Sequence, residues 1–458
     1  LRHYFSEYAL HKYRIKAEIE HMIALSEYFN GKVIRELGEE EKLNLRKLYE
    51  TFSEQEAYEV LQYDHLGRNG MGPTEHDVKS CELWIREKLK GTSTEDLIPY
   101  VHMFVTSEDI NNLAYKSMLA GAVNNIFAPA VYEVADILKG LATKYSDEPV
   151  MSRTHVQPAS PSTFGKIFGG YLARLTDGLE NLRKVTLKGK LNGAVGNYNA
   201  FVAAYPDLDW ISYSKVIAHR MGFATEIWTD QRGSHNDMNR AFAAIAEIGN
   251  VIRDLSTDLS LYAAFGTIYF TKVESHVGSS VMPHKINPWF AEVAEGNIKK
   301  ANYLFNCFAN EMDVSRLQRD LSDHDYERSY GEAVGYVLVA INHLKIALNL
   351  IYPNTDYARK ELRDNPQVVT EAIQTILRKY GQAEAYNILK KEFRGVTPTV
   401  EKMKEFAAKL EVEENIRKEI IDVLDTETYT GLASKLAKMA VDNYDMFRSS
   451  LHKDYLKI

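Results

Sequence analysis

The sequence predicts an all-α protein in which an elongated central bundle of long helices is flanked by two smaller helical domains. Apolar residues recur at alternating spacings of three and four over long stretches, which is typical of amphipathic helices. No run of alternating β-branched residues and no strand–helix–strand rhythm interrupts this pattern. With 458 residues the chain is also too long for one ordinary compact core. We expect an N-terminal domain over 1–105, the bundle over 106–351 and a C-terminal domain over 352–458.

The N-terminal region reads as shorter amphipathic helices, over residues 8–23 and 39–63. A loop rich in glycine follows, and Thr74 is then placed to cap the next helix, with Asp77 at the third helical position. This spacing puts His76 in the first turn, where its ring can face a cleft. A lone histidine of this kind is more often a surface residue than a ligand.

The first long helix is predicted to begin at the capping signature Thr106-Ser107-Glu108-Asp109 and to reach about Tyr145. Pro129 lies inside this run and predicts a kink or a local break, because proline lacks the N–H that the helix needs. The two hydroxyl residues have two readings. They are caps only, or they belong to a carboxylate site, since a helix N-terminus favours an anion.

Four more long helices are predicted from the same spacing, and their apolar runs cover residues 164–182, 245–262, 289–309 and 334–351. The proline-containing segment 146–163 is expected to be a loop, and the glycines and asparagines of 193–200 indicate unusual backbone dihedrals. Seams this long and apolar predict a homo-oligomer packed through the same helices. Beyond 352 the pattern shortens into smaller helices, over 366–380, 399–410 and 414–424.

Composition narrows the possible function classes. Hydrophobic residues make up 45% and charged residues 26% of the chain, which is typical of a folded globular protein. The formal net charge of −8 argues against nucleic acid as the main partner. Cys81 and Cys307 have no CxxC spacing, so we expect no disulfide scaffold, no cysteine metal site and a reducing cytoplasm. No apolar run of transmembrane length and no signal peptide is evident, so no membrane partner is expected.

The segment from Gly278 to Pro288 holds several chemically reactive side chains within a few residues. Two hydroxyls (Ser279 and Ser280), an imidazole, the Lys285 ammonium and a side-chain amide stand on one loop between two long helices. Such a loop can take a proton and hold an anion. On its own it is equally well explained as a glycine-serine turn.

This loop resembles the GSSxMPxKxNP signature of the aspartase/fumarase superfamily of lyases. Four further segments resemble motifs of the same superfamily in chain order: residues 106–112 (TSEDINN), 152–159 (SRTHVQPA), 193–200 (GAVGNYNA) and 315–320 (SRLQRD). Within the superfamily the chain is most similar to the adenylosuccinate lyases, particularly the bacterial type. The resemblance runs through nearly the whole chain.

The resemblance implies that a proton is removed beside a carboxylate and that the neighbouring C–N bond is broken. Fumarate is thereby released from adenylosuccinate or from the succinylated carboxamide ribotide of purine synthesis. Ser279 matches the base, helped by Lys285, and His155 matches the general acid, which Glu292 orients and keeps charged. Two other readings remain open: Ser280 as the working hydroxyl, and Glu292 as a solvated helix residue.

The residues that match the family's substrate contacts are His76, Asp77, Thr106, Ser107, Gln231, Asn287, Arg319 and Arg328. The resemblance implies no cofactor and no metal, and a cytoplasmic homotetramer whose sites each draw on more than one subunit. The chain departs from the family pattern at Glu75, where an asparagine commonly precedes His-Asp. We expect its carboxylate to point away from an anionic substrate.

Three alternative functions are less well supported by the sequence. Another lyase of the superfamily, such as an argininosuccinate lyase, is disfavoured by residues 193–200 and 315–328. A helical scaffold without catalysis is disfavoured by the intact Ser279, His155, Lys285 and Asn287. A metallohydrolase using His76, His102 and His155 would need a ligand spacing such as HExxH, which does not occur.

Overall fold

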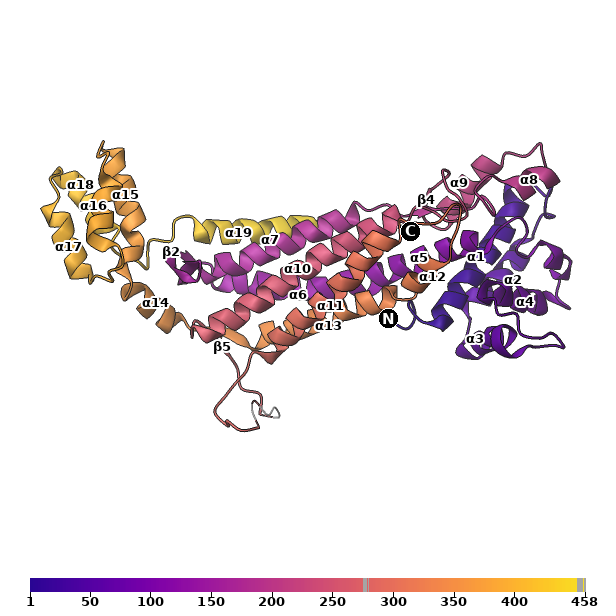
Figure 1. Ribbon diagram of the computed structural model, residues 1–458, viewed down its shortest axis with the longest axis horizontal. Helices are drawn as coiled ribbons and strands as arrows, with labels where there is room; N and C mark the ends of the chain where they lie inside the picture. The colour runs from indigo at the N-terminus through magenta and orange to yellow at the C-terminus, as the bar shows by residue number, and fades with distance from the viewer. Residues whose placement is uncertain (275–277, 279, 451–455, 457–458) are drawn as a thin grey trace.

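The computed structural model describes residues 1–274, 278, 280–450 and 456, and it has an elongated shape (Figure 1). Long helices run side by side through its middle. The N-terminal helices gather at one end, on the right in Figure 1, and a small unit of short helices stands at the other. The predicted all-α architecture, with a long bundle between two smaller helical parts, is confirmed.

The bundle consists of α5 (Ser107–Ala122), α6 (Ala128–Lys144), α7 (Phe164–Arg183), α10 (Asn236–Ala264), α11 (Trp289–Glu311) and α13 (Tyr330–Leu350). Helix α10 packs against α7 and α11, α11 packs against α13, and α6 packs against α7 and α13. The apolar stripe expected on α10 is buried, with Ile245, Ile248 and Ile252 exposed by 1% or less. Each such side chain contributes about 1.5–3 kcal/mol by its removal from water.

The interruption expected near Pro129 lies just before it. A single π-helical turn, η3 (Val123–Phe127), separates α5 from α6, and Pro129 occupies the first turn of α6. The π-helical turn accommodates the proline, because it shifts the hydrogen bonding just before Pro129 by one residue, so that the Ala128 N–H donates to the Val123 carbonyl oxygen. Helices α5 and α6 therefore run on through η3 as one continuous helical segment of the bundle.

The N-terminal part consists of α1 (Glu7–Tyr28), α2 (Glu39–Glu50), α3 (Glu54–Leu61), the π-helical turn η1 (Gln62–Leu66), α4 (Asp77–Leu89) and the 3₁₀ helix η2 (Glu95–Tyr100). Helix α1 packs against α5, and the buried residues of this part belong to the same hydrophobic core as those of the bundle. The end of the bundle and the N-terminal helices therefore form one packed body.

A second hydrophobic core lies under the short helices α14 (Thr355–Arg363), α15 (Thr370–Lys379), α16 (Ala385–Phe393), α17 (Val400–Lys409) and α18 (Glu414–Asp422), with the 3₁₀ helix η4 (Pro366–Val369). The last helix, α19 (Ala433–Ser449), departs from the C-terminal domain expected over 352–458. It returns along α7, and Tyr444 and Phe447 join the core of the bundle.

The segment expected to be a loop over 146–163 is a β-hairpin instead. Strands β1 (Pro149–Thr154) and β2 (Gln157–Thr163) pair antiparallel, and Thr154 lies opposite Gln157. The two turn residues, His155 and Val156, both have positive φ, of 52° and 65°. Two-residue hairpin turns use this geometry because it matches the twist of the strands, although glycine or asparagine usually supplies it. Sequence reasoning missed the hairpin for that reason.

The remaining strands are two residues or three residues long. They are β3 (Lys188–Gly189), parallel to β4 (Ala224–Thr225), and β5 (Ile268–Phe270), antiparallel to β6 (Ile351–Pro353). Three short helices, α8 (Asn199–Ala204), α9 (Trp210–Arg220) and α12 (Ser322–Glu327), lie between the long ones. These short strands hold loops against the bundle, and the fold remains predominantly helical.

The start of α4 also differs from the expectation. His76, not Thr74, is the N-cap residue, and its Nδ1 accepts a hydrogen bond from the backbone N–H of Lys79 at 3.3 Å. Glu75 has φ of 48°, so the chain turns sharply just before the helix. The Thr74 hydroxyl instead contacts the Ser80 hydroxyl at 2.8 Å and braces this turn. Asp77 is thereby the first helical residue.

One stretch of the described residues, Ser322–Leu350, has the length and apolar composition of a membrane span, which corrects our expectation that no such run exists. It comprises α12 and α13, and 44% of its most apolar window is buried inside the protein. Helix α13 packs against α6, α10 and α11. Burial within the bundle therefore explains much of its composition.

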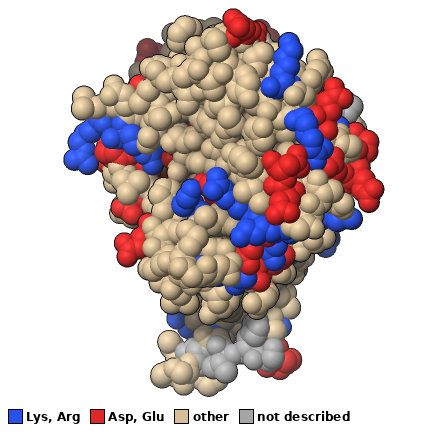
Figure 2. Space-filling model, turned by 90° about the vertical axis from the view of Figure 1, so that its right-hand side faces the viewer, with Lys and Arg blue, Asp and Glu red and all other residues tan. Residues whose placement is uncertain are grey.

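The end of the molecule formed by the N-terminal helices carries a mixture of charges. Figure 2 shows acidic and basic residues interspersed over this face, with wide uncharged areas between them. A face that binds nucleic acid usually presents a continuous basic patch. The described residues visible on this face do not form one.

Candidate active site

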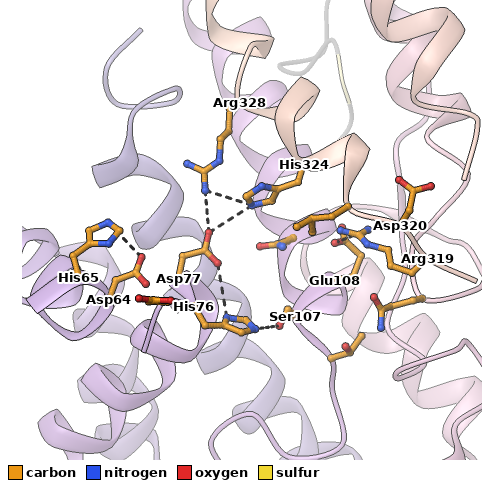
Figure 3. A pocket seen from close by; sticks show the side chains of 15 residues that line it. Asp64, His65, His76, Asp77, Ser107, Glu108, Arg319, Asp320, His324 and Arg328 are labelled. Carbon is orange, nitrogen blue, oxygen red and sulfur yellow. Dashed lines mark hydrogen bonds and ion pairs between the residues drawn. The ribbon is translucent and has the colours of Figure 1, made fainter. Parts of the chain in front are cut away.

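A pocket of about 920 Å³ opens where the N-terminal helices meet the end of the bundle (Figure 3). Its lining brings together residues from α4, the start of α5, the loop before α10 and the segment around α12. The lining residues are Asp64, His65, Glu75, His76, Asp77, Thr106, Ser107, Glu108, Asn111, Gln231, Arg319, Asp320, Leu321, His324 and Arg328. Seven of the eight predicted substrate contacts, all except Asn287, are among them.

Asp77 is the most highly paired carboxylate in the described lining. Its Oδ2 accepts hydrogen bonds from Nη2 of the buried Arg14 at 2.8 Å and from Nη2 of Arg328 at 3.1 Å, and it lies 3.7 Å from Nε2 of His324. Arg328 also donates to Glu7 at 2.6 Å. Burial alone would raise the pKa of the Asp77 carboxyl, yet the contacts with His324 and Arg14 hold that pKa well below its usual range.

These contacts predict a loss of stability in acid. Because the pKa of Asp77 is lower in the folded chain, its contribution to the free energy of unfolding is fully present above the unfolded value of about 3.9. That contribution declines as the pH falls through this value toward the folded pKa. We expect Asp77→Asn to lower the Tm at neutral pH and to make the acid decline of Tm shallower than in the wild type.

Thermal unfolding followed by circular dichroism over a pH series measures both effects. Glu75→Gln is the matched control, because Glu75 is an exposed carboxylate of the same pocket. Parallel acid declines in the wild type and in Asp77→Asn would contradict the role given to this carboxylate.

The start of α5 forms one wall of the pocket. Thr106 is the N-cap residue, and its backbone N–H donates to Asp109 Oδ2 at 2.9 Å, which confirms the predicted capping signature. The Ser107 hydroxyl lies 3.5 Å from Nε2 of His76. Free N–H groups and two hydroxyls at a helix N-terminus suit a carboxylate ligand.

A buried ion pair fixes this wall to the segment 193–200. Asp109 and Lys190 are fully buried and lie 2.8 Å apart, and Asp109 also accepts from the backbone N–H of Asn192 and Gly193. Gly193 and Gly196 have φ of 85° and 78°, as their type predicted. A side chain at Gly196 would collide with the backbone of Thr229, so the close approach of these two loops requires glycine.

Arg319 projects into the pocket from the segment before α12. Its Nη1 lies 3.0 Å from Glu108 Oε2 and 3.0 Å from Asp323 Oδ2. Gln231 stands beside this segment, with its backbone N–H 3.4 Å from the carbonyl oxygen of Gln318. Glu75 also lines the pocket, and the direction expected for its carboxylate stays a prediction. The pocket therefore contains both acidic and basic side chains, and its arginines already form ion pairs with carboxylates.

The predicted general acid lies elsewhere. His155 is exposed at the tip of the hairpin, where its positive φ holds it out from the strands. Close to this turn, the hairpin is anchored through Arg153, which forms an ion pair with Glu361 and lies over the ring of Phe265. A strained residue on a braced support is a common arrangement at functional sites.

The two ends of the predicted proton-abstracting loop are in contact with each other. The Asn287 side-chain amide donates to the carbonyl oxygen of Gly278 at 2.8 Å, and a side chain at 278 would collide with the backbone of Lys285. Asn287 thus shapes the loop within this chain. Lys285 is exposed, and so is Glu292 in the first turn of α11. Ser279 lies outside the described residues.

The two groups of site residues stand at opposite ends of the bundle. The hairpin and β5, after which the loop begins, are at the left-hand end in Figure 1, whereas α4, which begins with the pocket residue Asp77, is at the right-hand end. Helix α10 connects the two ends with 29 residues, a length of about 44 Å. One chain therefore does not bring His155 and the pocket together.

Sequence reasoning missed two residues that organise the pocket. His324 was not singled out, although it stands four positions before Arg328 and so shares its helical face. Arg14 was also missed. It follows the buried Leu10 by four positions, which places a guanidinium on the apolar face of α1. A charge on a buried face is a signal that could have identified it.

Comparison with known families matches both parts of the chain. A family model described as lyase matches residues 2–301, and one described as adenylosuccinate lyase C-terminal matches residues 315–430. An adenylosuccinate lyase of Legionella pneumophila (strain Corby) is 35% identical, over 95% of this chain and 94% of the relative. The chain belongs to the adenylosuccinate lyase family.

Other relatives of this adenylosuccinate lyase family member agree with the assignment. The adenylosuccinate lyase of Escherichia coli (strain K12) is 33% identical, over 94% of this chain and 93% of the relative. Among solved structures, a fumarate lyase from Mesorhizobium sp. BNC1 matches with a TM-score of 0.75 at 16% identity, covering 96% of this chain and 97% of that one. A 3-carboxy-cis,cis-muconate lactonizing enzyme from Pseudomonas putida matches with a TM-score of 0.72 at 19% identity, over 98% and 97%. These two structures share the fold.

Proposed function

We propose that this lyase releases fumarate from adenylosuccinate to give AMP, and from the succinylated carboxamide ribotide of purine synthesis by the same reaction. The observation that carries the proposal is the pocket of Figure 3, which gathers the residues matching the family's substrate contacts around Arg319 and Arg328. Guanidinium groups, a helix N-terminus and histidines together suit a substrate with several carboxylate and phosphate groups.

The chemistry is an elimination that begins with removal of a proton from the carbon beside a carboxylate. Ser279 takes this proton, with Lys285 supplying the nearby positive charge that a serine base needs. Lys285 and Asn287 hold the carboxylate and the negative charge that develops on the carbon. His155 protonates the leaving nitrogen on the opposite face, and Glu292 keeps its ring oriented and charged.

The site is completed in a homotetramer, because the pocket and His155 are separated by the length of the bundle. A second copy that runs antiparallel along the bundle would bring its hairpin and loop to the pocket of the first. Exposed apolar side chains along the bundle support this packing, such as Val339 and Leu261, which are 42% and 43% exposed. We place the enzyme in the cytoplasm, where purine nucleotides are made.

The direct test incubates the purified protein with adenylosuccinate and follows AMP and fumarate by chromatography. We expect both products in equal amounts. A parallel incubation with argininosuccinate is the control for a related lyase activity. Arginine release without AMP release would contradict the proposal, and so would no reaction with adenylosuccinate.

A further inference from the structure

A layer of buried acidic residues lies directly beneath the pocket. Glu108, Asp323 and Glu327 come from α5 and α12, and they are exposed by only 3%, 2% and 3%. Glu108 lines the pocket, whereas Glu327 is not part of the lining and stands four positions after Asp323 on α12. Three ionised carboxylates in a dry site repel one another strongly unless cations or protons compensate them.

Cations compensate only part of this charge. Arg319 Nη1 touches both Glu108 and Asp323 at 3.0 Å. His235 Nε2 and Arg232 Nε lie 3.5 Å and 3.9 Å from Asp323 Oδ2. Among the described residues no ion pair reaches Glu327, and its Oε2 is buried without a hydrogen-bond partner.

The other groups that face Glu327 supply only part of the missing charge. Arg14 is nearby, but its Nη2 is bound to Asp77, and its buried Nη1 has no hydrogen-bond partner among the described residues. The phenols of Tyr115 and Tyr330 are buried beside it, and burial raises the pKa of each, so both are neutral. Burial, followed by the charges of Glu108 and Asp323, raises the pKa of the Glu327 carboxyl well above its usual value. Burial and the unpartnered Oε2 therefore favour the neutral form of the Glu327 carboxyl.

The geometry of Arg319 shows what this proton does. Both contacts of its guanidinium with the described carboxylates run through Nη1, which leaves Nη2 for a ligand in the pocket. A guanidinium fixed at one nitrogen in this way presents the other without a further loss of side-chain freedom.

We propose that Glu327 is a positioning residue that acts through Arg319: while it is neutral, Arg319 reaches the pocket, and when it ionises, Arg319 is drawn into the acidic layer. This proposal rests on the proposed function, in which Arg319 binds an anionic group of the substrate. The withdrawal of Arg319 weakens substrate binding and does not involve the reacting atoms.

The expected result is a rise of KM by about tenfold as the pH is increased from neutrality, with little change in kcat, because one charge-assisted hydrogen bond is lost. Glu327→Gln keeps the shape and stays neutral at every pH. We expect it to show the KM of the wild type at neutral pH and no alkaline rise. A variant with the same alkaline rise as the wild type would overturn the proposal.

Asp325→Asn is the matched control, because Asp325 lies on the same helix, is exposed, and likewise exchanges a carboxyl group for an amide. It should retain the alkaline rise of KM, and a loss of the rise in this variant would overturn the assignment to Glu327. Arg319→Ala should have a raised KM with no further alkaline rise. An alkaline rise that persists without Arg319 would show that Glu327 does not act through it.

Infrared spectroscopy tests the proton without any turnover. At neutral pH the wild type should show the carbonyl stretch of a protonated, buried carboxyl, and Glu327→Gln should lack it. Its absence from the wild type would overturn the proposal. This readout separates the two hypotheses, since a protein that failed to cleave adenylosuccinate would still show the band.

Discussion

Replacing Ser279 with alanine is expected to lower kcat for adenylosuccinate by about 10²- to 10⁴-fold, which is the usual contribution of a general base. The elimination cannot begin until the proton beside the carboxylate is removed, and alanine has no group to take it. We expect KM to change little, because most residues that match the family's substrate contacts lie in the pocket. Steady-state kinetics at several substrate concentrations separates the two parameters.

Ser280→Ala is the control for this experiment. The neighbouring hydroxyl differs from Ser279 by one position, and the residues alone left it open as the working group. We expect Ser280→Ala to keep much the larger part of the activity. If Ser280→Ala lost turnover and Ser279→Ala kept it, the base would be assigned to the wrong serine.

The second large effect is expected for His155→Ala, with a loss of kcat of about 10²- to 10⁴-fold. Without a proton from His155 the leaving nitrogen would depart as a poorly stabilised anion. The pH profile should also lose the limb that reports the acid form of the enzyme. The profile is measured from kcat over a series of buffers.

His219→Ala is the matched control, because His219 is an exposed histidine of α9 and lies outside the pocket lining. It should leave both kcat and the pH profile unchanged. A His155→Ala enzyme with the full pH profile of the wild type would show that another group protonates the leaving nitrogen.

Most of the fold could be predicted from the spacing of apolar residues. The stripe on α10 and the cap at Thr106 depend on local rules, and both were found where expected. The hairpin and the start of α4 could not be found in this way. Each depends on a residue other than glycine with positive φ, such as His155, Val156 or Glu75, and a sequence pattern does not reveal such a residue.

The site residues also fall into those that the sequence could predict and those that it could not. Family motifs identified residues such as Asp77 and Arg319 that the structure gathers in one pocket. The groups that lower the pKa of Asp77, which are His324 and Arg14, belong to no motif that we recognised. Their importance comes from burial beside other charges, and burial depends on how α1, α5 and α12 pack together. Only the structure supplies that information.

The central claim is that one site combines the pocket of one chain with the hairpin and loop of another. It is tested most directly by mixing two inactive variants, His155→Ala and the pocket variant Arg319→Ala/Arg328→Ala. These positions stand at opposite ends of the bundle, so some sites in a mixed oligomer would have both ends intact. The account predicts that unfolding and refolding the two variants together restores turnover of adenylosuccinate. A mixture no more active than the two variants measured separately would contradict it.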